Sequence, residues 1–137
     1  MIWWGDYMKK WLIVSSILLV LIFIIAGGVY IMKEKENQKA EDELERLVSV
    51  EKPRIEKYFK YNFTGVNKVT VTGAEIHPTG IPHIKGYVND DKDLYFNAAI
   101  HKDHFEGDLS IPYGLEEMQK SDLSVSEIQE REQGSKE

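Results

Sequence analysis

The sequence predicts an α+β protein in which an N-terminal transmembrane helix precedes an amphipathic helix packed on a four-stranded antiparallel meander sheet. Three observations lead to this prediction. An uncharged apolar run lies near the start, apolar residues then recur at helical spacing, and from Val66 onward the spacing changes to two. With 137 residues, the chain has room for one small domain beside the apolar run.

The apolar run extends from Trp11 to Met32 without a charged residue. A helix of that length, rising about 1.5 Å per residue, covers about 33 Å and crosses a hydrocarbon core of about 30 Å. Trp11 and Tyr30 lie near its two ends, where aromatic rings favour the membrane interface. The alternative is a buried core helix, but so small a domain cannot surround a helix that is apolar on every face. We therefore expect a transmembrane helix over 11–32.

A cleaved signal peptide is the second alternative, with Lys9-Lys10 as its basic region and small residues at 26–28. Apolar sequence continues through Val29–Met32, which favours an uncleaved anchor. Basic residues flank both ends of the run, so charge counting alone does not set the orientation. Met8, an alternative start, precedes Lys9-Lys10 in the layout of a signal-anchor. We therefore expect a single-pass protein of the cell membrane with residues 1–10 in the cytoplasm and the domain outside it.

A charged spacer over 33–43 is followed by an apolar stripe at spacings of three, four and seven. The stripe consists of Leu44, Leu47, Val48, Ile55, Tyr58 and Phe59. Charged side chains, including Glu51, fill the other face in this interpretation. The spacing predicts an amphipathic helix over roughly 40–61, in which Pro53 either produces a kink or starts a second helix. Gly65 is its expected stop.

Four strands are predicted after Gly65, because β-branched and aromatic residues alternate with polar ones between turn residues. They are Val66–Ile76, Ile81–Asn89, Leu94–His101 and Phe105–Ile111. Asp90–Asp93 forms the expected polar hairpin connection. Packing the helix stripe on one face of this sheet gives a small α+β domain over 44–118. Residues 119–137 form a C-terminal helix or tail, in which Ser124 and Glu127 have the spacing of a capping box.

Two tyrosines are the candidate partner surface. On the second predicted strand, Ile84 and Val88 share one face, and Tyr87 lies on the other. If the helix covers the Ile84 face, Tyr87 and its possible cross-strand partner Tyr95 lie on the open side of the sheet. An exposed aromatic face is a candidate for binding another protein, whereas simple cross-strand packing is the alternative.

The chain resembles an uncharacterised family of small membrane-anchored or lipoprotein-like proteins from Gram-positive Firmicutes, a domain of unknown function. The resemblance covers most of the chain from about Lys52 onward. It rests on Ile55–Tyr58, Lys60–Phe63, His83–Asp91, Leu94–Phe96, Phe105–Ser110 and Ser124–Ile128. It implies no activity and no catalytic residue. Some relatives look lipid-anchored, but this chain has no cysteine to carry a lipid.

Composition and motifs exclude several classes of function. The net charge of −6, from 17 basic and 23 acidic residues, argues against nucleic-acid binding. The absence of cysteine excludes disulfides, thiolate metal sites and a cysteine nucleophile. The serine-hydrolase, phosphate-loop and dinucleotide motifs are also missing from the sequence. We therefore expect a protein that is not an enzyme and uses no cofactor.

Histidines are the remaining candidates for metal chemistry. His101 and His104, with Asp108 close behind, offer ligands for zinc or another divalent ion. On a strand a spacing of three sends two side chains to opposite faces, so this site requires a turn within 102–104. Two further groups carry metal-binding side chains: His77 and His83, which flank a turn, and Asp90, Asp91 and Asp93, which lack the spacing of a calcium loop.

Three functions are compatible with these observations. The first is a membrane-anchored extracytoplasmic module for protein interaction, or of the immunity type, with Tyr87 and Tyr95 as its surface. The second is a metal- or solute-binding domain that uses His101, His104 and Asp108. The third is an accessory subunit of a membrane complex.

Overall fold

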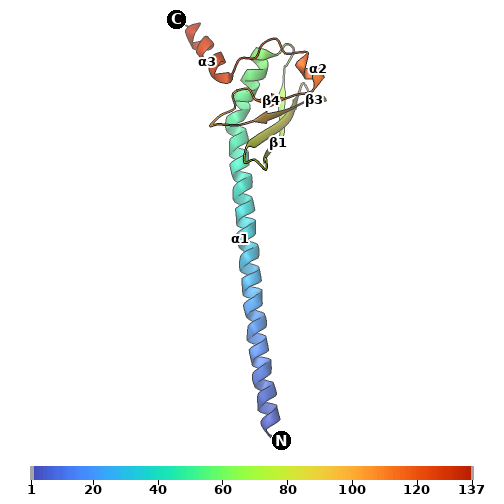
Figure 1. Cartoon of the computed structure of the whole chain (residues 1–137), viewed down its shortest axis with the longest axis vertical. Coiled ribbons are helices and arrows are strands. Elements are labelled where there is room, and N and C mark those ends of the chain that lie inside the picture. The colour runs from blue at the N-terminus through green and yellow to red at the C-terminus, as the bar shows by residue number, and fades with distance from the viewer. Residues whose placement is uncertain (1, 137) are drawn as a thin grey trace. The chain divides into compact units, whose positions relative to one another are not determined.

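The computed structural model describes residues 2–136, with side chains from Trp4 onward. It contains two compact units, divided between Asp42 and Glu43. The first helix, α1 (Ile2–Asn62), runs through the first unit and into the second (Figure 1). Within the first unit, the large apolar side chains between Trp11 and Met32 are exposed. This helix is long and apolar enough to cross a membrane.

The last five turns of α1 belong to the second unit and carry the predicted stripe. Ile55, Tyr58 and Phe59 are buried, which confirms the helical spacing that predicted them. Pro53 lies inside α1, so it does not start a second helix. The helix ends at Asn62, and Gly65 follows with a φ of +82°, a value that glycine adopts without steric cost.

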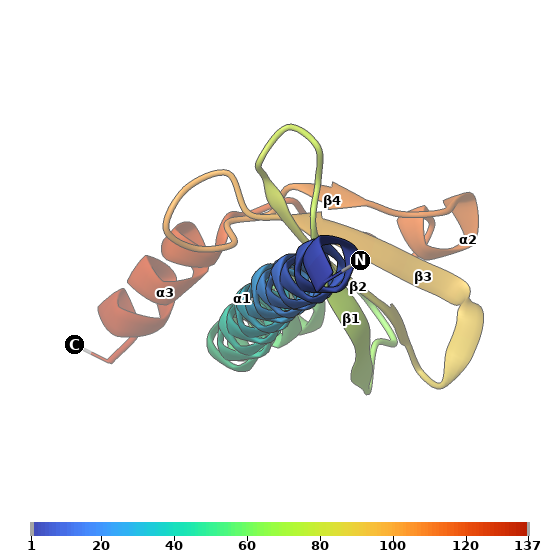
Figure 2. The same cartoon turned by 90° about the horizontal axis from the view of Figure 1, so that it is seen from below.

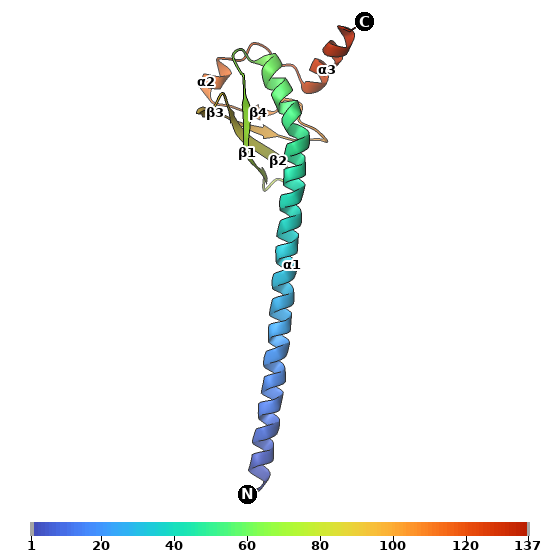
Figure 3. The same ribbon diagram turned by 180° about the vertical axis from the view of Figure 1, so that it is seen from behind.

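The sheet confirms the predicted α+β class and meander. Its strands are β1 (Val69–Ile76), β2 (Pro82–Val88), β3 (Asp91–Ala99) and β4 (Leu109–Ser110). They lie in the order β1-β2-β3-β4, with every neighbouring pair antiparallel. The end of α1 and the sheet lie side by side (Figures 1 and 3).

The fourth strand is shorter than the predicted Phe105–Ile111. The reason is that the backbone of Phe105 bonds to helix side chains instead of a strand. Its N–H donates to Glu51 at 2.9 Å, and its carbonyl accepts from Arg54 at 3.2 Å. Only Leu109 and Ser110 remain to pair with β3.

The hairpin between β2 and β3 also differs from the prediction. Its turn is Asn89-Asp90, both with a φ of 56°, and Asp91 already pairs with Val88. Two residues at positive φ match the right-handed twist of the flanking strands, and asparagine and aspartate tolerate this conformation. The Asn89 side chain fixes the turn by donating to the Gly65 carbonyl at 2.7 Å.

The core lies between the end of α1 and one face of the sheet. Ile84, Val88 and Phe96 are almost fully buried on that face, as the alternation along the second strand predicts. The rings of Phe59 and Phe96 lie 5.1 Å apart, a separation typical of favourable aromatic packing.

Two short helices complete the fold on opposite sides of the domain, α2 (Tyr113–Glu116) and α3 (Val125–Gly134) (Figure 2). The capping box predicted at the start of α3 is present. The Ser124 side chain accepts from the Glu127 N–H, and the Glu127 carboxylate accepts from the Ser124 N–H at 2.8 Å. Val125 and Ile128 are fully buried, so α3 contributes to the core.

Replacing Gly86 is expected to destabilise the domain. A Cβ at this position would lie 2.7 Å from the Phe96 ring and would also collide with the Thr70 carbonyl. Gly86→Ala should therefore lower the free energy of unfolding by about 2 kcal/mol, the cost of overpacking a tight core. Urea denaturation of the two proteins measures this difference.

Gly73→Ala is the matched control, because Gly73 lies on the neighbouring strand and a Cβ there meets nothing within 4 Å. Its free energy of unfolding should differ from that of the unmodified protein by no more than about 0.5 kcal/mol, as for ordinary surface substitutions. Equal effects of the two substitutions would contradict the packing described for Gly86.

Candidate functional site

The face of the sheet opposite the core carries the two candidate tyrosines. Register places Thr70, Tyr87 and Tyr95 directly opposite one another on three neighbouring strands. Tyr87 is half-buried, while Tyr95 exposes 55% of its surface. The cross-strand pairing of the tyrosines is thus confirmed, and they lie on the face away from Ile84 and Val88.

Polar side chains continue this face toward the other end of the strands. We call this side of the sheet the open face; its residues are Thr70, Glu75, His83, Lys85, Tyr87, Tyr95 and Asn97. Lys85 and Glu75 form an ion pair at 2.5 Å, and His83 Nδ1 lies 2.9 Å from Asn97 Oδ1. The hydrogen bond from the Lys85 ammonium, and then its positive charge, hold the pKa of Glu75 below its ordinary value. The open face therefore combines an aromatic end with a polar end.

A buried carboxylate fixes the loop between β3 and β4 onto α1. Glu51 is fully buried. One of its oxygens accepts from the Phe105 N–H at 2.9 Å, and the other lies 2.7 Å from His104 Nδ1. The guanidinium of Arg54 stands 3.8 Å away, one turn further along the helix. A buried carboxylate is tolerated only with such partners, so these contacts serve first to hold the loop.

Arg54 extends this network to α3. Its guanidinium donates to Glu106 at 2.7 Å, and Glu106 in turn accepts from the backbone N–H and the hydroxyl of Ser126. Burial opposes ionisation of Glu106, but the Ser126 hydrogen bonds and the Arg54 charge together hold its pKa below the ordinary value. The stabilisation that Glu106 provides is therefore present above its ordinary pKa of 4.5 and is lost as the pH falls through the lower, folded-state value.

The structure separates the three predicted metal ligands. His101 Nε2 pairs with Asp108, but His104 turns to Glu51. Within residues 4–136 there is no group of three or more histidine, aspartate or glutamate side chains in an arrangement that holds a metal ion. His101, His104 and Asp108 therefore do not form one site.

Sequence reasoning assigned Glu51 to the charged outer face, and this assignment was wrong. Glu51 lies three residues after Val48 and four before Ile55, so its position falls on the apolar stripe itself. A charged residue at a stripe position was the available signal that it is buried with partners. Asn62 is a second such case, four residues after Tyr58 and also fully buried.

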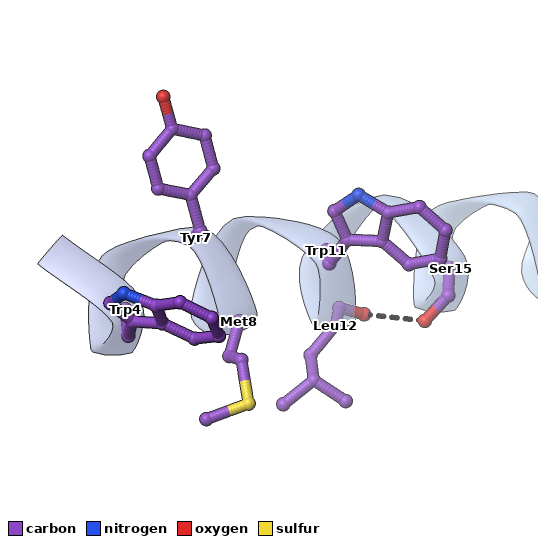
Figure 4. Close-up of a pocket in the computed structure, with 6 residues that line it drawn as sticks. All are labelled: Trp4, Tyr7, Met8, Trp11, Leu12 and Ser15. Carbon is purple, nitrogen blue, oxygen red and sulfur yellow. Dashed lines mark hydrogen bonds between the residues drawn. The ribbon is translucent and has the colours of Figure 1, made fainter.

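In the first unit, a hollow of about 790 Å³ is lined by one side of α1 alone (Figure 4). Its lining is Trp4, Tyr7, Met8, Trp11, Leu12 and Ser15. Ser15 donates its hydroxyl to the Leu12 carbonyl at 3.0 Å, so this polar group is satisfied within its own helix. A surface on one helix has no second wall, so it is not an enclosed ligand site.

Comparisons with known proteins agree with the predicted resemblance. Residues 47–130 match the family described as "Protein of unknown function (DUF1433)". A solved structure, the folded 79-residue fragment of Lin0334 from Listeria innocua, is similar with 30% identity and a TM-score of 0.53. The similarity covers 63% of this chain and 94% of that fragment. A search of curated proteins found no match.

Replacing Glu51 tests the role of the buried carboxylate. Glu51→Gln puts an amide where two oxygens faced the Phe105 N–H and His104, and it removes the buried carboxylate 3.8 Å from Arg54, which keeps its shorter contact with Glu106. We expect the free energy of unfolding to fall by about 3 kcal/mol, as when one partner of a buried ion pair is removed. Thermal or urea unfolding gives the value.

Glu45→Gln, an exposed position on the same helix, is the control and should change stability by less than about 0.5 kcal/mol. A Glu51→Gln protein as stable as the control would show that the loop is held by other contacts.

Proposed function

The chain belongs to this family of proteins of unknown function, and we propose that it is a single-pass membrane-anchored module that binds a protein partner outside the cytoplasm through its open face. The observation that carries this proposal is the pair Tyr87 and Tyr95. Both lie on the uncovered side of the sheet, and Tyr95 exposes 55% of its surface although it belongs to a central part of the strand.

The chemistry of the open face suits a protein partner. Tyrosine offers a large apolar ring and a hydroxyl at a small entropic cost, and it is enriched among the residues that dominate binding energy. Lys85, Asn97 and Glu75 lie toward one end of the pair and offer groups that hydrogen-bond at an interface rim. The expected partner therefore presents an apolar patch with hydrogen-bonding groups along one side.

The remaining polar clusters support binding rather than catalysis. The imidazoles of His101 and His104 are each paired with a carboxylate, and the buried Glu51 is engaged by the loop it holds. The buried Glu51 and its partner His104 are thereby engaged in holding the loop. We therefore propose an activity that involves no catalytic step.

The apolar part of α1 supports the anchor. Moving its exposed side chains between Trp11 and Met32 from water into lipid lowers the free energy, and a helix satisfies its own backbone hydrogen bonds in lipid. With the N-terminus in the cytoplasm, the second unit lies outside the cell membrane. Because the chain has a net charge of −6, an anionic lipid surface does not attract it, and the helix alone holds it there.

Reporter fusions test the orientation. Alkaline phosphatase, which is active only outside the cytoplasm, should be active when fused after Glu137, and a cytoplasm-dependent fluorescent protein at the same position should stay dark. The fusion should remain in the membrane fraction after an alkaline wash. The opposite reporter pattern would place the domain inside the cell and exclude this part of the proposal.

Site-specific photocrosslinking tests the surface. A photoreactive phenylalanine analogue at position 95 should give a discrete adduct in intact cells, and Tyr87→Ala should abolish it. The captured protein is then identified and purified, and its affinity for the full chain should fall at least about tenfold with Tyr95→Ala, as for a residue worth more than 1 kcal/mol.

Position 113 is the matched control, because Tyr113 lies on α2, outside the open face, and exposes 72% of its surface. The same analogue there should give no such adduct. An adduct at 113 and none at 95, or a purified partner that binds Tyr95→Ala as tightly as the unmodified chain, would contradict the proposed surface.

A further inference from the structure

The hairpin between β1 and β2 brings two histidines together at the polar end of the open face. Glu75 pairs directly with His83, so His77, two residues beyond Glu75, is the diagonal neighbour of His83 on the same face. The two imidazole rings lie 5.1 Å apart with 30° between their planes. The sequence places these two histidines on either side of a turn, and the strand register makes them neighbours in space.

The backbone of this hairpin holds His77 in place. The His77 N–H donates to the Ile81 carbonyl at 2.9 Å, and the Gly80 N–H donates to the His77 carbonyl at 2.7 Å. Gly80 has a φ of +83°, which lets the chain reverse tightly. The hairpin projects from the sheet (Figure 2). His77 is exposed and His83 is half-buried.

Each imidazole has one nitrogen occupied by a neutral oxygen. His83 Nδ1 lies 2.9 Å from Asn97 Oδ1, and His77 Nδ1 lies 3.0 Å from Thr79 Oγ1. Among the hydrogen bonds of residues 4–136, neither Nε2 atom has a protein partner. When His83 Nδ1–H donates to Asn97, its Nε2 lone pair is free. His77 Nδ1 also lies 3.4 Å from the Thr79 backbone nitrogen, whose N–H donates to it, so the Nε2 lone pair of His77 becomes free when the ring changes tautomer and its Nδ1–H donates to Thr79 Oγ1 instead. Histidines that bind metals have this arrangement, with the second nitrogen oriented by a protein oxygen.

We propose that His77 and His83 form a two-histidine site for a divalent transition-metal ion, bound through the two Nε2 atoms and completed by water. Paired imidazoles suit Zn²⁺, Ni²⁺ and Cu²⁺ and do not suit Mg²⁺ or Ca²⁺, which require oxygen ligands. The carboxylate of Glu75, directly across from His83, contributes negative charge nearby while it remains paired with Lys85. The site does not depend on the proposed partner binding.

This site differs from the one predicted from sequence. His101 and His104 each give a nitrogen to a carboxylate of their own, and they do not share a neighbour. His77 and His83 face one another instead, with no carboxylate between the rings. The ion would bridge β1 and β2 at the hairpin and stiffen the polar end of the open face.

Titration of the full chain in detergent micelles with Zn²⁺ or Ni²⁺ tests the proposal. Calorimetry should show one ion per chain, and the imidazole resonances of His77 and His83 should shift in nitrogen-edited spectra. His77→Gln and His83→Gln should each abolish this binding. Asn97→Ala should weaken it by about tenfold, the typical effect of losing an orienting hydrogen bond. Circular dichroism checks that the variants remain folded.

The control is His101→Gln, which replaces an exposed histidine outside the hairpin, keeps the proposed ligands and should bind the ion as the unmodified chain does. Ca²⁺ should not bind in either protein. Absence of Zn²⁺ and Ni²⁺ binding at millimolar concentration would overturn the proposal. Binding that survives His77→Gln or that disappears in the His101→Gln protein would overturn it equally.

Discussion

The contacts of the Glu51 carboxylate determine how the second unit is assembled. This side chain is fully buried and holds the Phe105 N–H and His104 of a loop that is distant in sequence. Because Phe105 bonds to the helix, β4 is short. The next residue of the loop, Glu106, then accepts hydrogen bonds from Arg54 and Ser126. Helix α1, the loop and α3 are thus joined by one chain of charge-assisted hydrogen bonds. Their strength depends on burial, since the same pairs in water would contribute little.

The same helix serves two different surroundings along its length. Between Trp11 and Met32 it is apolar on all sides, which suits lipid, whereas beyond Glu43 it is apolar along one stripe only. The stripe begins at Leu44, next to the start of the second compact unit at Glu43, and it follows the charged segment 33–43. A single helix can therefore supply an anchor in one unit and half of a hydrophobic core in the other, without a separate linker sequence of turn-forming residues.

The fold was largely predictable, because periodicity is a local property. The stripe at Ile55, Tyr58 and Phe59, the alternation around Ile84 and the capping box at Ser124 each depend on residues within a few positions. The candidate sites were less predictable, because they depend on which distant segments meet. His104 joins Glu51 across the fold, and His77 meets His83 only through the strand register. The Asn89-Asp90 turn was missed because its acidic neighbours are equally typical of a longer loop.

Asn62 joins the end of α1 to the segment around Leu123, so this contact determines when the domain can finish folding. Its buried amide donates to the Leu123 carbonyl and accepts from the Leu123 N–H and the Ser121 hydroxyl. Val125 and Ile128 then fill the core. Leu123 follows Asn62 by 61 positions in the chain, so during synthesis the end of α1 keeps an unsatisfied amide and an open core until that segment has been made. A domain built in this way completes its core only after a segment distant in sequence has joined the helix.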